Sequence, residues 1–164
     1  MYQDSISTLT QQFPVNGELV WIGIRPARKQ TMLSVEEILV DCQHGLIGDH
    51  YAGSSGKRQL TLFQWEHLAV LESFVGENIT PGMLRRNLVI RGINLTSLKK
   101  QTFQIGSAVF KTTGLCHPCS RMENVLGRGG YNAMRNHGGI TAQIIQPGQI
   151  KIGDELTVLQ SENL

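Results

Sequence analysis

The residues with the clearest chemical potential are two cysteines, Cys116 and Cys119, in the segment TTGLCHPCSRMEN. This segment predicts a strand, a tight glycine turn and a helix that starts beside Cys119. A thiol at a helix N-terminus has its thiolate form stabilised by unpaired backbone N–H groups, and Arg121 adds positive charge nearby. The pattern therefore predicts a reactive thiolate at Cys119, with Cys116 close enough to resolve it.

Other interpretations of these cysteines remain open. Most free cysteines are small buried core residues, so both thiols could be inert. A thioredoxin-type dithiol is disfavoured because that motif follows the first long strand of a βαβ unit, whereas this one occupies positions 116–119 of 164. A zinc site needs two further ligands, which Cys42 and His44 could supply. A single thiolate that ligates a metal cofactor, or carries sulfur as a persulfide, explains most of the segment.

A second cluster lies in the glycine-rich run GLIGDHYAGSSGKR, residues 45–58. Its glycines, Gly48 among them, let the backbone approach a ligand closely. Asp49 and His50 offer acid–base or hydrogen-bonding groups, and Lys57 and Arg58 offer charge that binds anions. The plain alternative is a surface turn with solvated charges.

A third cluster, Arg85-Arg86-Asn87, precedes a predicted strand. One of two adjacent arginines at a strand start usually points into solvent, and an Asn there can fix a loop or read the edge of a heterocycle. His67 and His137 are expected to be packed or exposed rather than functional.

Most of the remaining sequence has the patterns of short β-strands. Two look-alike segments, 103–114 and 148–159, each predict a pair of strands around an Ile-Gly-polar turn. Residues 1–13 are polar and predict no element. Further strands are predicted at 18–26, 35–41, 59–64, 88–90 and 140–146, and helices at 65–76, 120–126 and 131–136.

These helices do not alternate with the strands in βαβ fashion, which disfavours a doubly wound parallel sheet. The edges of many short strands are best hidden by closing the sheet. We therefore predict a mostly β fold, an antiparallel β-barrel with a few short helices. The expected organisation is an N-terminal extension at 1–16, a single domain at 17–160 and a C-terminal tail at 161–164.

Composition excludes several classes of partner. With 15 Lys and Arg against 13 Asp and Glu, the net charge is only +2, so a basic field for nucleic acid is not expected. No run approaches the ~20 apolar residues of a membrane helix, and the N-terminus lacks the pattern of a secretory signal. Three cysteines form an odd count at low density, which argues against a secreted disulfide scaffold and favours the cytoplasm.

Taken together and in this order, the clusters resemble the MOSC domain, named for its place at the C-terminus of molybdenum cofactor sulfurases. The similarity covers about residues 17–160, and the resemblance implies a β-strand-rich barrel. The matching stretches are GLIGDHYAG, KRQLTLFQWEHL, PGMLRRNLVIRGINL, FQIGSAVFKTTGLCHPCSRM and IIQPGQIKIGDELTVL.

The resemblance implies molybdenum cofactor chemistry. Some family members carry or transfer sulfur, and others hold the cofactor and reduce N-hydroxylated compounds. The family's key cysteine, a sulfur carrier or molybdenum ligand, falls in Pro-Cys and maps onto Cys119. Asp49, Arg58 and Asn87 match recurrent family positions. This chain departs from the family in its short loop between Asp49 and Arg58, its lack of an accompanying desulfurase or second barrel, and its additional thiol, Cys116.

The resulting first hypothesis is an enzyme that holds the cofactor between the Asp49 loop and the Cys119 turn. Cys119 is the molybdenum ligand, Asp49 orients substrate or relays a proton, and Cys116 assists in catalysis. Arg58, Arg85 or Arg86 holds the cofactor's phosphate. The full set of expected cofactor-binding residues is Gly48, His50, Lys57, Arg58, Arg85, Arg86, Asn87 and Arg121.

Two alternatives belong to other classes. In one, Cys119 is a non-catalytic sulfur carrier that receives sulfane sulfur from a cysteine desulfurase and passes it to an acceptor. In the other, the chain is a structural or zinc-binding barrel without molybdenum chemistry. An electron-donor protein is an expected partner if the chain is a reductase. Bound pyridoxal phosphate is not expected, because no Schiff-base lysine motif stands out.

Overall fold

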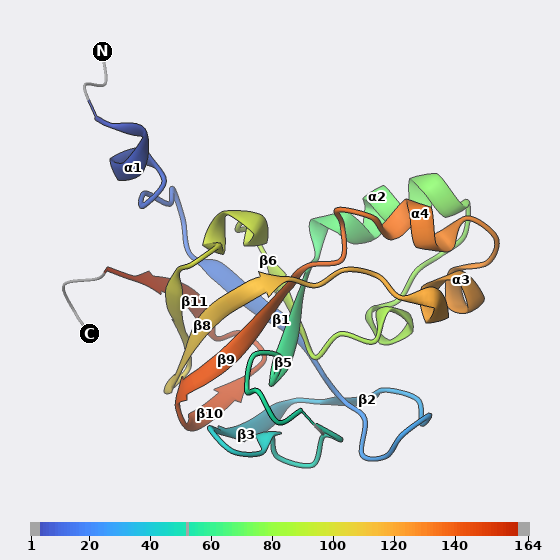
Figure 1. Cartoon of the computed structure of the whole chain (residues 1–164), viewed down its shortest axis with the longest axis horizontal. Coiled ribbons are helices and arrows are strands. Elements are labelled where there is room, and N and C mark those ends of the chain that lie inside the picture. The colour runs from blue at the N-terminus through green and yellow to red at the C-terminus, as the bar shows by residue number, and fades with distance from the viewer. Residues whose placement is uncertain (1–3, 52, 161–164) are drawn as a thin grey trace.

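Seven strands close into a barrel in the computed structural model, which describes residues 4–51 and 53–160 (Figure 1). Closure results from β1 (Gly17–Ile24), which pairs with β6 (Leu88–Arg91) along one edge and with β11 (Glu155–Leu159) along the other. The short strand β2 (Leu33–Val35) continues that second edge beyond β11. Around the barrel the strands are β1 (Gly17–Ile24), β11 (Glu155–Leu159), β7 (Thr102–Ile105), β8 (Ala108–Leu115), β9 (Ile140–Gln146), β5 (Leu60–Gln64) and β6 (Leu88–Arg91).

The barrel is mixed because β5 and β6 run parallel, while its other pairings are antiparallel. The chain crosses between these two strands through the helix α2 (Glu66–Val75) and the 3-10 turn η1 (Pro81–Leu84). A closed, mostly β architecture was predicted from the strand pattern, and the structure confirms it. The parallel pair is the departure from a purely antiparallel barrel.

A second, three-stranded sheet consists of β10 (Gly148–Lys151), β3 (Glu37–Asp41) and β4 (Gly45–Leu46). The single strand predicted at 35–41 is therefore divided, because Val35 belongs to β2, which pairs with β1, and residues 37–41 form β3 in this second sheet. The prediction of one strand pair over 148–159 is also wrong, because β10 pairs with β3 whereas β11 pairs with β7 and β1. The turn between them is fastened to Leu19, whose N–H donates to Asp154 O at 2.9 Å.

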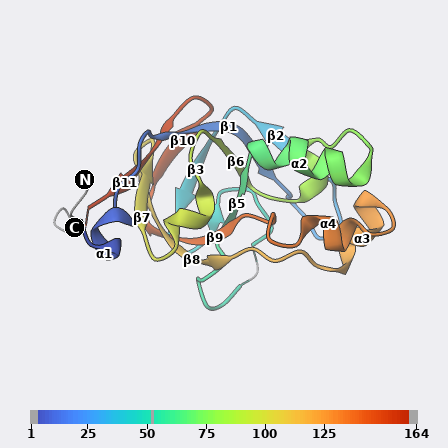
Figure 2. The ribbon, with the colours of Figure 1, turned by 90° about the horizontal axis from the view of Figure 1, so that it is seen from above.

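The helices α2, α3 (Ser120–Leu126) and α4 (Gly130–Met134) gather at one end of the barrel, whereas α1 (Ile6–Leu9) lies at the other end (Figures 1 and 2). The turn of helix at α1, which Ser5 caps, corrects the expectation that residues 1–13 contain no element. Between residues 4 and 160, Ala52 excepted, no helix has the length and apolar character to cross a membrane. Residues 1–3 and the expected tail at 161–164 lie outside the described residues.

Two hydrophobic cores fill the molecule. The first fills the barrel, where Leu62, Leu88 and Phe110 are fully buried. The second lies under the helices and includes Phe63 and Val89. Because successive side chains of a strand point to opposite faces, β5 and β6 each contribute to both cores. Since the barrel interior is packed with side chains, a ligand site must lie outside it.

Candidate functional site

A polar cavity of about 210 Å³ opens where β1, the loop after β4, and the starts of β5 and β6 meet. Its lining contains five of the residues that the sequence singled out, together with several that it did not. The lining residues are Arg25, Met32, Asp49, His50, Tyr51, Arg58, Gln59, Thr61, Arg85 and Asn87.

The loop that carries Asp49 is fastened to the end of β1. Gly48 has a φ of +93°, a left-handed conformation that favours glycine, and it turns the chain back toward the barrel. The N–H of Arg25 donates to Asp49 Oδ1 at 2.6 Å, and the N–H of His50 donates to Arg25 O at 2.7 Å. One carboxylate oxygen of Asp49 is thus held by backbone, and the side chain remains at the cavity wall.

Asn87 joins three strands at the floor of the cavity. Its Oδ1 accepts hydrogen bonds from Thr61 N at 3.0 Å and Thr61 Oγ1 at 3.1 Å, and its Nδ2 donates to Gly23 O at 3.3 Å. Of the two interpretations given for this Asn, the structure supports fixing of the backbone, since both ends of the amide are engaged by protein groups.

Three of the lining residues carry a buried donor that has no hydrogen-bond partner within the described part of the chain: Arg25 Nε, Tyr51 Oη and Arg85 Nη2. Leaving a buried donor unpaired costs about 1–3 kcal/mol, so native proteins rarely do so without a reason. Arg85 also has a left-handed backbone, with φ +57° and ψ +38°, which is uncommon outside glycine. These three residues therefore combine unused donor capacity with a place in the cavity lining.

Neither thiol belongs to the lining of this cavity, and Cys116 contacts one of its lining residues. Cys119 is exposed and occupies the N-cap position of α3, as the sequence predicts. Cys116 is buried, with 2% of its surface exposed. Arg58, a lining residue of the cavity, directs Nη2 to the Cys116 sulfur at 3.7 Å and so joins the cavity to the thiols.

Arg86 is buried beneath the thiols and binds backbone. Its guanidinium donates to the carbonyl oxygens of Gly138 at 2.8 Å, Leu84 at 3.1 Å and Cys116 at 3.4 Å. Burial lowers the pKa of Arg86, and the neighbouring thiols Cys116 and Cys119 oppose that shift. Because its donors are directed at carbonyls, Arg86 holds the site together and does not line the cavity.

The structure thus separates the predicted site residues into three groups. Asp49, His50, Arg58, Arg85 and Asn87 line the cavity. Cys116, Cys119 and Arg86 form the adjoining thiol cluster. Gly48 shapes the loop, whereas the side chains of Lys57 and Arg121 are exposed and outside the lining.

Sequence reasoning missed Arg25 and Tyr51. Arg25 lies near the end of the strand predicted at 18–26, and Tyr51 follows the Gly-Asp-His run, so both were close to recognised features. Neither has a local signal of function, because only the contact between the end of β1 and the loop after β4 brings them together.

The described residues do not bring the four expected zinc ligands, Cys42, His44, Cys116 and Cys119, together in one metal site. The Cys42 thiol is exposed and is directed at Ile145 O at 3.7 Å, and His44 Nδ1 lies 2.9 Å from Asp41 Oδ2. Residues 4–51 and 53–160 contain no group of three or more His, Cys, Asp or Glu side chains arranged to hold a metal ion.

His67 and His137, expected to be packed or exposed, are half-buried against each other. Their rings meet edge to face with centroids 4.8 Å apart. Burial lowers the pKa of His67, His137 lowers it further, and Glu66 opposes the shift. Protonation of His67 is therefore less favourable in the folded chain than in the unfolded chain.

A pH dependence of stability follows from this pair. Because the unfolded state binds the proton more tightly, the free energy of unfolding should fall as pH drops from 7.5 to 5.5. His67→Gln should reduce this fall by less than about 1 kcal/mol, since the imidazole is only half-buried. Urea unfolding at the two pH values measures the effect. His117→Gln, at an exposed histidine, is the control, and an equal change there would contradict the assignment.

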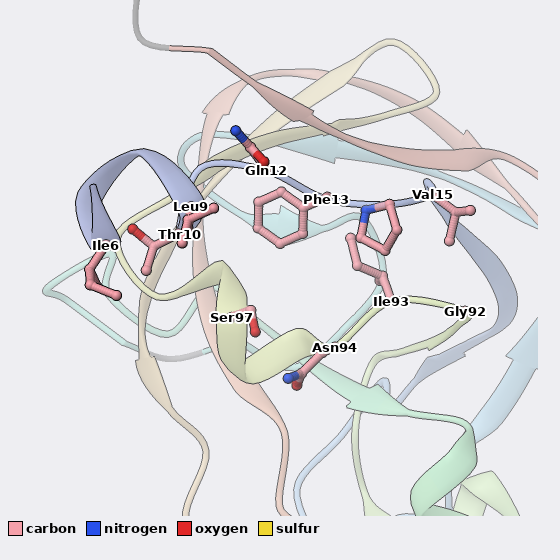
Figure 3. Close-up of a pocket in the computed structure, with 11 residues that line it drawn as sticks. Ile6, Leu9, Thr10, Gln12, Phe13, Val15, Gly92, Ile93, Asn94 and Ser97 are labelled. Carbon is pink, nitrogen blue, oxygen red and sulfur yellow. The ribbon is translucent and has the colours of Figure 1, made fainter. Parts of the chain in front are cut away.

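A larger cavity, of about 460 Å³, lies between α1 and the 3-10 turn η2 (Leu95–Leu98) (Figure 3). Leu9, Phe13 and Ile93 give it a mainly apolar wall. It contains none of the predicted site residues. The smaller cavity beside the thiols is therefore the candidate functional site.

Comparison with solved structures identifies the class of fold. YuaD from Bacillus subtilis superposes with a TM-score of 0.76 at 19% identity, over 88% of this chain and 96% of that chain. YiiM from Geobacillus stearothermophilus gives 0.72 at 17% identity, over 88% and 75% of the two chains. YiiM from Escherichia coli gives 0.70 at 18%, over 90% and 71%. No curated protein matches the chain.

These likenesses define a β-barrel domain with the fold of YuaD and YiiM. The family assignment comes from the sequence itself: residues 41–157 match the family model of the MOSC domain, and the chain belongs to that family. The resemblance drawn from the separate motifs is thereby confirmed. The matched segment contains both thiols and all of the cavity residues except Arg25 and Met32.

Proposed function

We propose that this chain is a stand-alone MOSC protein that handles the molybdenum cofactor, with Cys119 as the ligand of the metal. The observation that carries the proposal is the position of Arg58, which lines a polar cavity and also donates to the sulfur of Cys116. An exposed, soft thiolate suits molybdenum better than hard carboxylates. The residues present therefore fit both a soft metal and an anionic group.

Each side chain then has a distinct role. Cys119 would hold the metal, and Arg58 and Arg85 would bind the phosphate through charge-assisted hydrogen bonds. The Asp49 carboxylate, oriented by the N–H of Arg25, would position the substrate or accept its proton. The bound cofactor would supply two-electron redox chemistry. The family resemblance favours reduction of N-hydroxylated compounds, with electrons from a donor protein in the cytoplasm.

A second function is favoured by the exposure of the Cys119 sulfur. In this function, the Cys119 thiolate attacks the terminal sulfur of a cysteine desulfurase persulfide. A new S–S bond forms on Cys119, the desulfurase thiolate leaves, and no external oxidant is consumed. The buried Cys116 lies beside Arg58. Its thiolate would resolve the persulfide by attacking the Cys119 sulfur, which would form a Cys116–Cys119 disulfide and release the terminal sulfur as hydrosulfide.

Metal analysis tests the first function. After expression in a cofactor-competent host, the wild type should contain molybdenum, and Cys119→Ala should fall to background because the thiolate ligand is gone. Cys42→Ala removes an exposed cysteine outside the site and should keep the metal. Negligible molybdenum in wild type and Cys119→Ala alike would contradict cofactor binding.

Intact-mass spectrometry tests the carrier function separately. Incubation with a cysteine desulfurase and cysteine should add the mass of one sulfur atom to the wild type and to Cys42→Ala. Cys119→Ser should gain none. An adduct that persists on Cys119→Ser would place the sulfur on another residue and remove this function.

A further inference from the structure

The N-terminal arm, residues 4–16, forms one wall of the cavity of about 460 Å³ whose other wall is the segment that contains η2. The arm contains α1, which lies at the opposite end of the barrel from α3 and its N-cap residue Cys119 (Figures 1 and 2). The lining of this cavity has no residue in common with that of the candidate functional site. The molecule therefore has a second cavity that the proposed function does not use.

Apolar side chains that water can reach gather around this second cavity. Ile6 is 77% exposed, Val15 59% and Leu9 39%, and all three line it. In Figure 3 the side chains of Leu9 and Phe13 come from the arm, and that of Ile93 comes from the segment before η2. Phe13 packs against the barrel core to which Ile93 belongs. Single exposed apolar residues are ordinary, whereas several around one cavity mark a place where an apolar group binds.

A polar hollow of about 480 Å³ adjoins the apolar cavity and differs from it in chemistry. Thr10 and Ser97 line both, so the two meet at these residues. Lys99 and Lys100 line the polar hollow, and both are exposed. A ligand that extends from the apolar cavity through this junction reaches two ammonium groups.

The charge beside the apolar cavity is positive. Within residues 4–51 and 53–160, neither lining contains an Asp or a Glu, and neither Lys99 nor Lys100 takes part in an ion pair. The Asp4 carboxylate, which accepts a hydrogen bond from Gln12 Nε2 at 3.2 Å, lines neither hollow. Two ammonium groups without a lining carboxylate favour an anionic group on the ligand.

The volume of the apolar cavity limits the apolar part of that ligand. A methylene group takes up about as much space as a water molecule, roughly 30 Å³, so the cavity accommodates one alkyl chain of about ten carbon atoms. Two such chains, as in a phospholipid, would exceed its volume. The cavity therefore suits a ligand with a single chain.

We propose that the apolar cavity and the polar hollow together bind a single-chain aliphatic carboxylate. The alkyl chain lies between the arm and Ile93, and the carboxylate lies beside Lys99 and Lys100. This inference goes beyond the proposed function and does not rest on it, because the two sites lie at opposite ends of the barrel.

Calorimetric titration with decanoate, below the concentration at which it forms micelles, tests the site. The wild type should bind decanoate, and it should bind dodecanoate more tightly and octanoate more weakly. The expected change is roughly two- to fourfold per methylene, because each added methylene is removed from water. Decyltrimethylammonium has the same chain and the opposite charge, and it should bind roughly tenfold more weakly.

A pair of leucine variants tests the apolar cavity. Leu9→Gln should weaken decanoate binding roughly fivefold or more, because it replaces an apolar wall of the cavity with an amide. Leu39→Gln is the matched control, since it makes the same replacement at an exposed leucine of β3 outside both linings, and it should bind like the wild type. Urea unfolding verifies that each variant is folded.

A pair of double lysine variants tests the position of the carboxylate. Lys99→Gln with Lys100→Gln should weaken decanoate binding about two- to fivefold per lysine, the range expected for exposed ion pairs. Lys29→Gln with Lys151→Gln removes the same charge from exposed side chains outside both linings and should leave binding unchanged. Equal weakening in the two double variants would show a response to net charge alone and would overturn the proposal.

The other outcomes are equally definite. The absence of decanoate binding to the wild type, or equal weakening in Leu9→Gln and Leu39→Gln, would overturn the site. A wild-type dimer that Leu9→Gln dissociates, without decanoate binding, would assign the cavity to a second copy of the chain instead. Cys119→Ala should bind decanoate like the wild type. If decanoate binds but molybdenum is absent from the wild type, the proposed function fails while this site stands.

Discussion

Arg86→Met is expected to lower the free energy of unfolding by about 3 kcal/mol. The native guanidinium donates to the carbonyl oxygens of Leu84, Cys116 and Gly138, and only 7% of the Arg86 surface is exposed. Methionine fills a similar volume but leaves these carbonyls without their donor. The loss of a buried charge offsets part of the cost, because burial already disfavours the cation and lowers its pKa.

Urea unfolding of purified variants measures this effect. Arg121→Met is the control, because Arg121 is exposed on α3 and its replacement should change stability by less than about 0.5 kcal/mol. Arg86→Lys should be intermediate, since it keeps the charge but not the planar set of donors. If Arg86→Met is no more costly than Arg121→Met, Arg86 does not hold the segments around the site together.

Gly139→Ala should have a comparable or larger effect and could prevent folding. Gly139 has a φ of +85°, and a Cβ there would lie 1.9 Å from the Leu62 carbonyl oxygen. Because Leu62 pairs with Ile140 between β5 and β9, relief of this clash would have to separate two barrel strands. The expected loss exceeds about 3 kcal/mol, which few single substitutions reach.

A second glycine with a similar backbone conformation separates the cost of the steric clash from the cost of the left-handed backbone. Gly129 has a φ of +89°, but a Cβ there would have no neighbour within 4 Å. Gly129→Ala should therefore cost only the left-handed backbone strain, about 1–2 kcal/mol. Equal costs at the two positions, or a stable folded Gly139→Ala, would show that β5 and β9 can move apart easily. Denaturant midpoints, or the yield of folded protein, give the comparison.

Much of the fold could be predicted because its strands have clear local signals. Alternating apolar residues mark β5, and a glycine ends α2 as predicted, with Gly76 at φ +79°. Which strands pair with each other was harder to predict from the sequence. The parallel pairing of β5 with β6 and the antiparallel pairing of β10 with β3 join segments distant in sequence, and residue patterns do not specify which edges meet.

In the candidate site, too, the chemically important residue types could be predicted from the sequence, but their positions in the fold could not. The residue types of Cys119, Asp49 and Arg58 were sufficient to single them out. Sequence could not separate Arg85 from Arg86, although the first lines the cavity and the second is buried in backbone contacts. Nor could it find Arg25, because its importance arises from the loop that packs against it.

The closure of the barrel has a consequence for synthesis of the protein. Gly17 in β1 pairs with Leu156 in β11, so strands near the two ends of the described chain must meet before the barrel is complete. A nascent chain leaving the ribosome therefore carries an open β1 edge until β11 has emerged. Such an edge can pair with other chains, so slow translation of the segment before β11 should favour aggregation or chaperone capture.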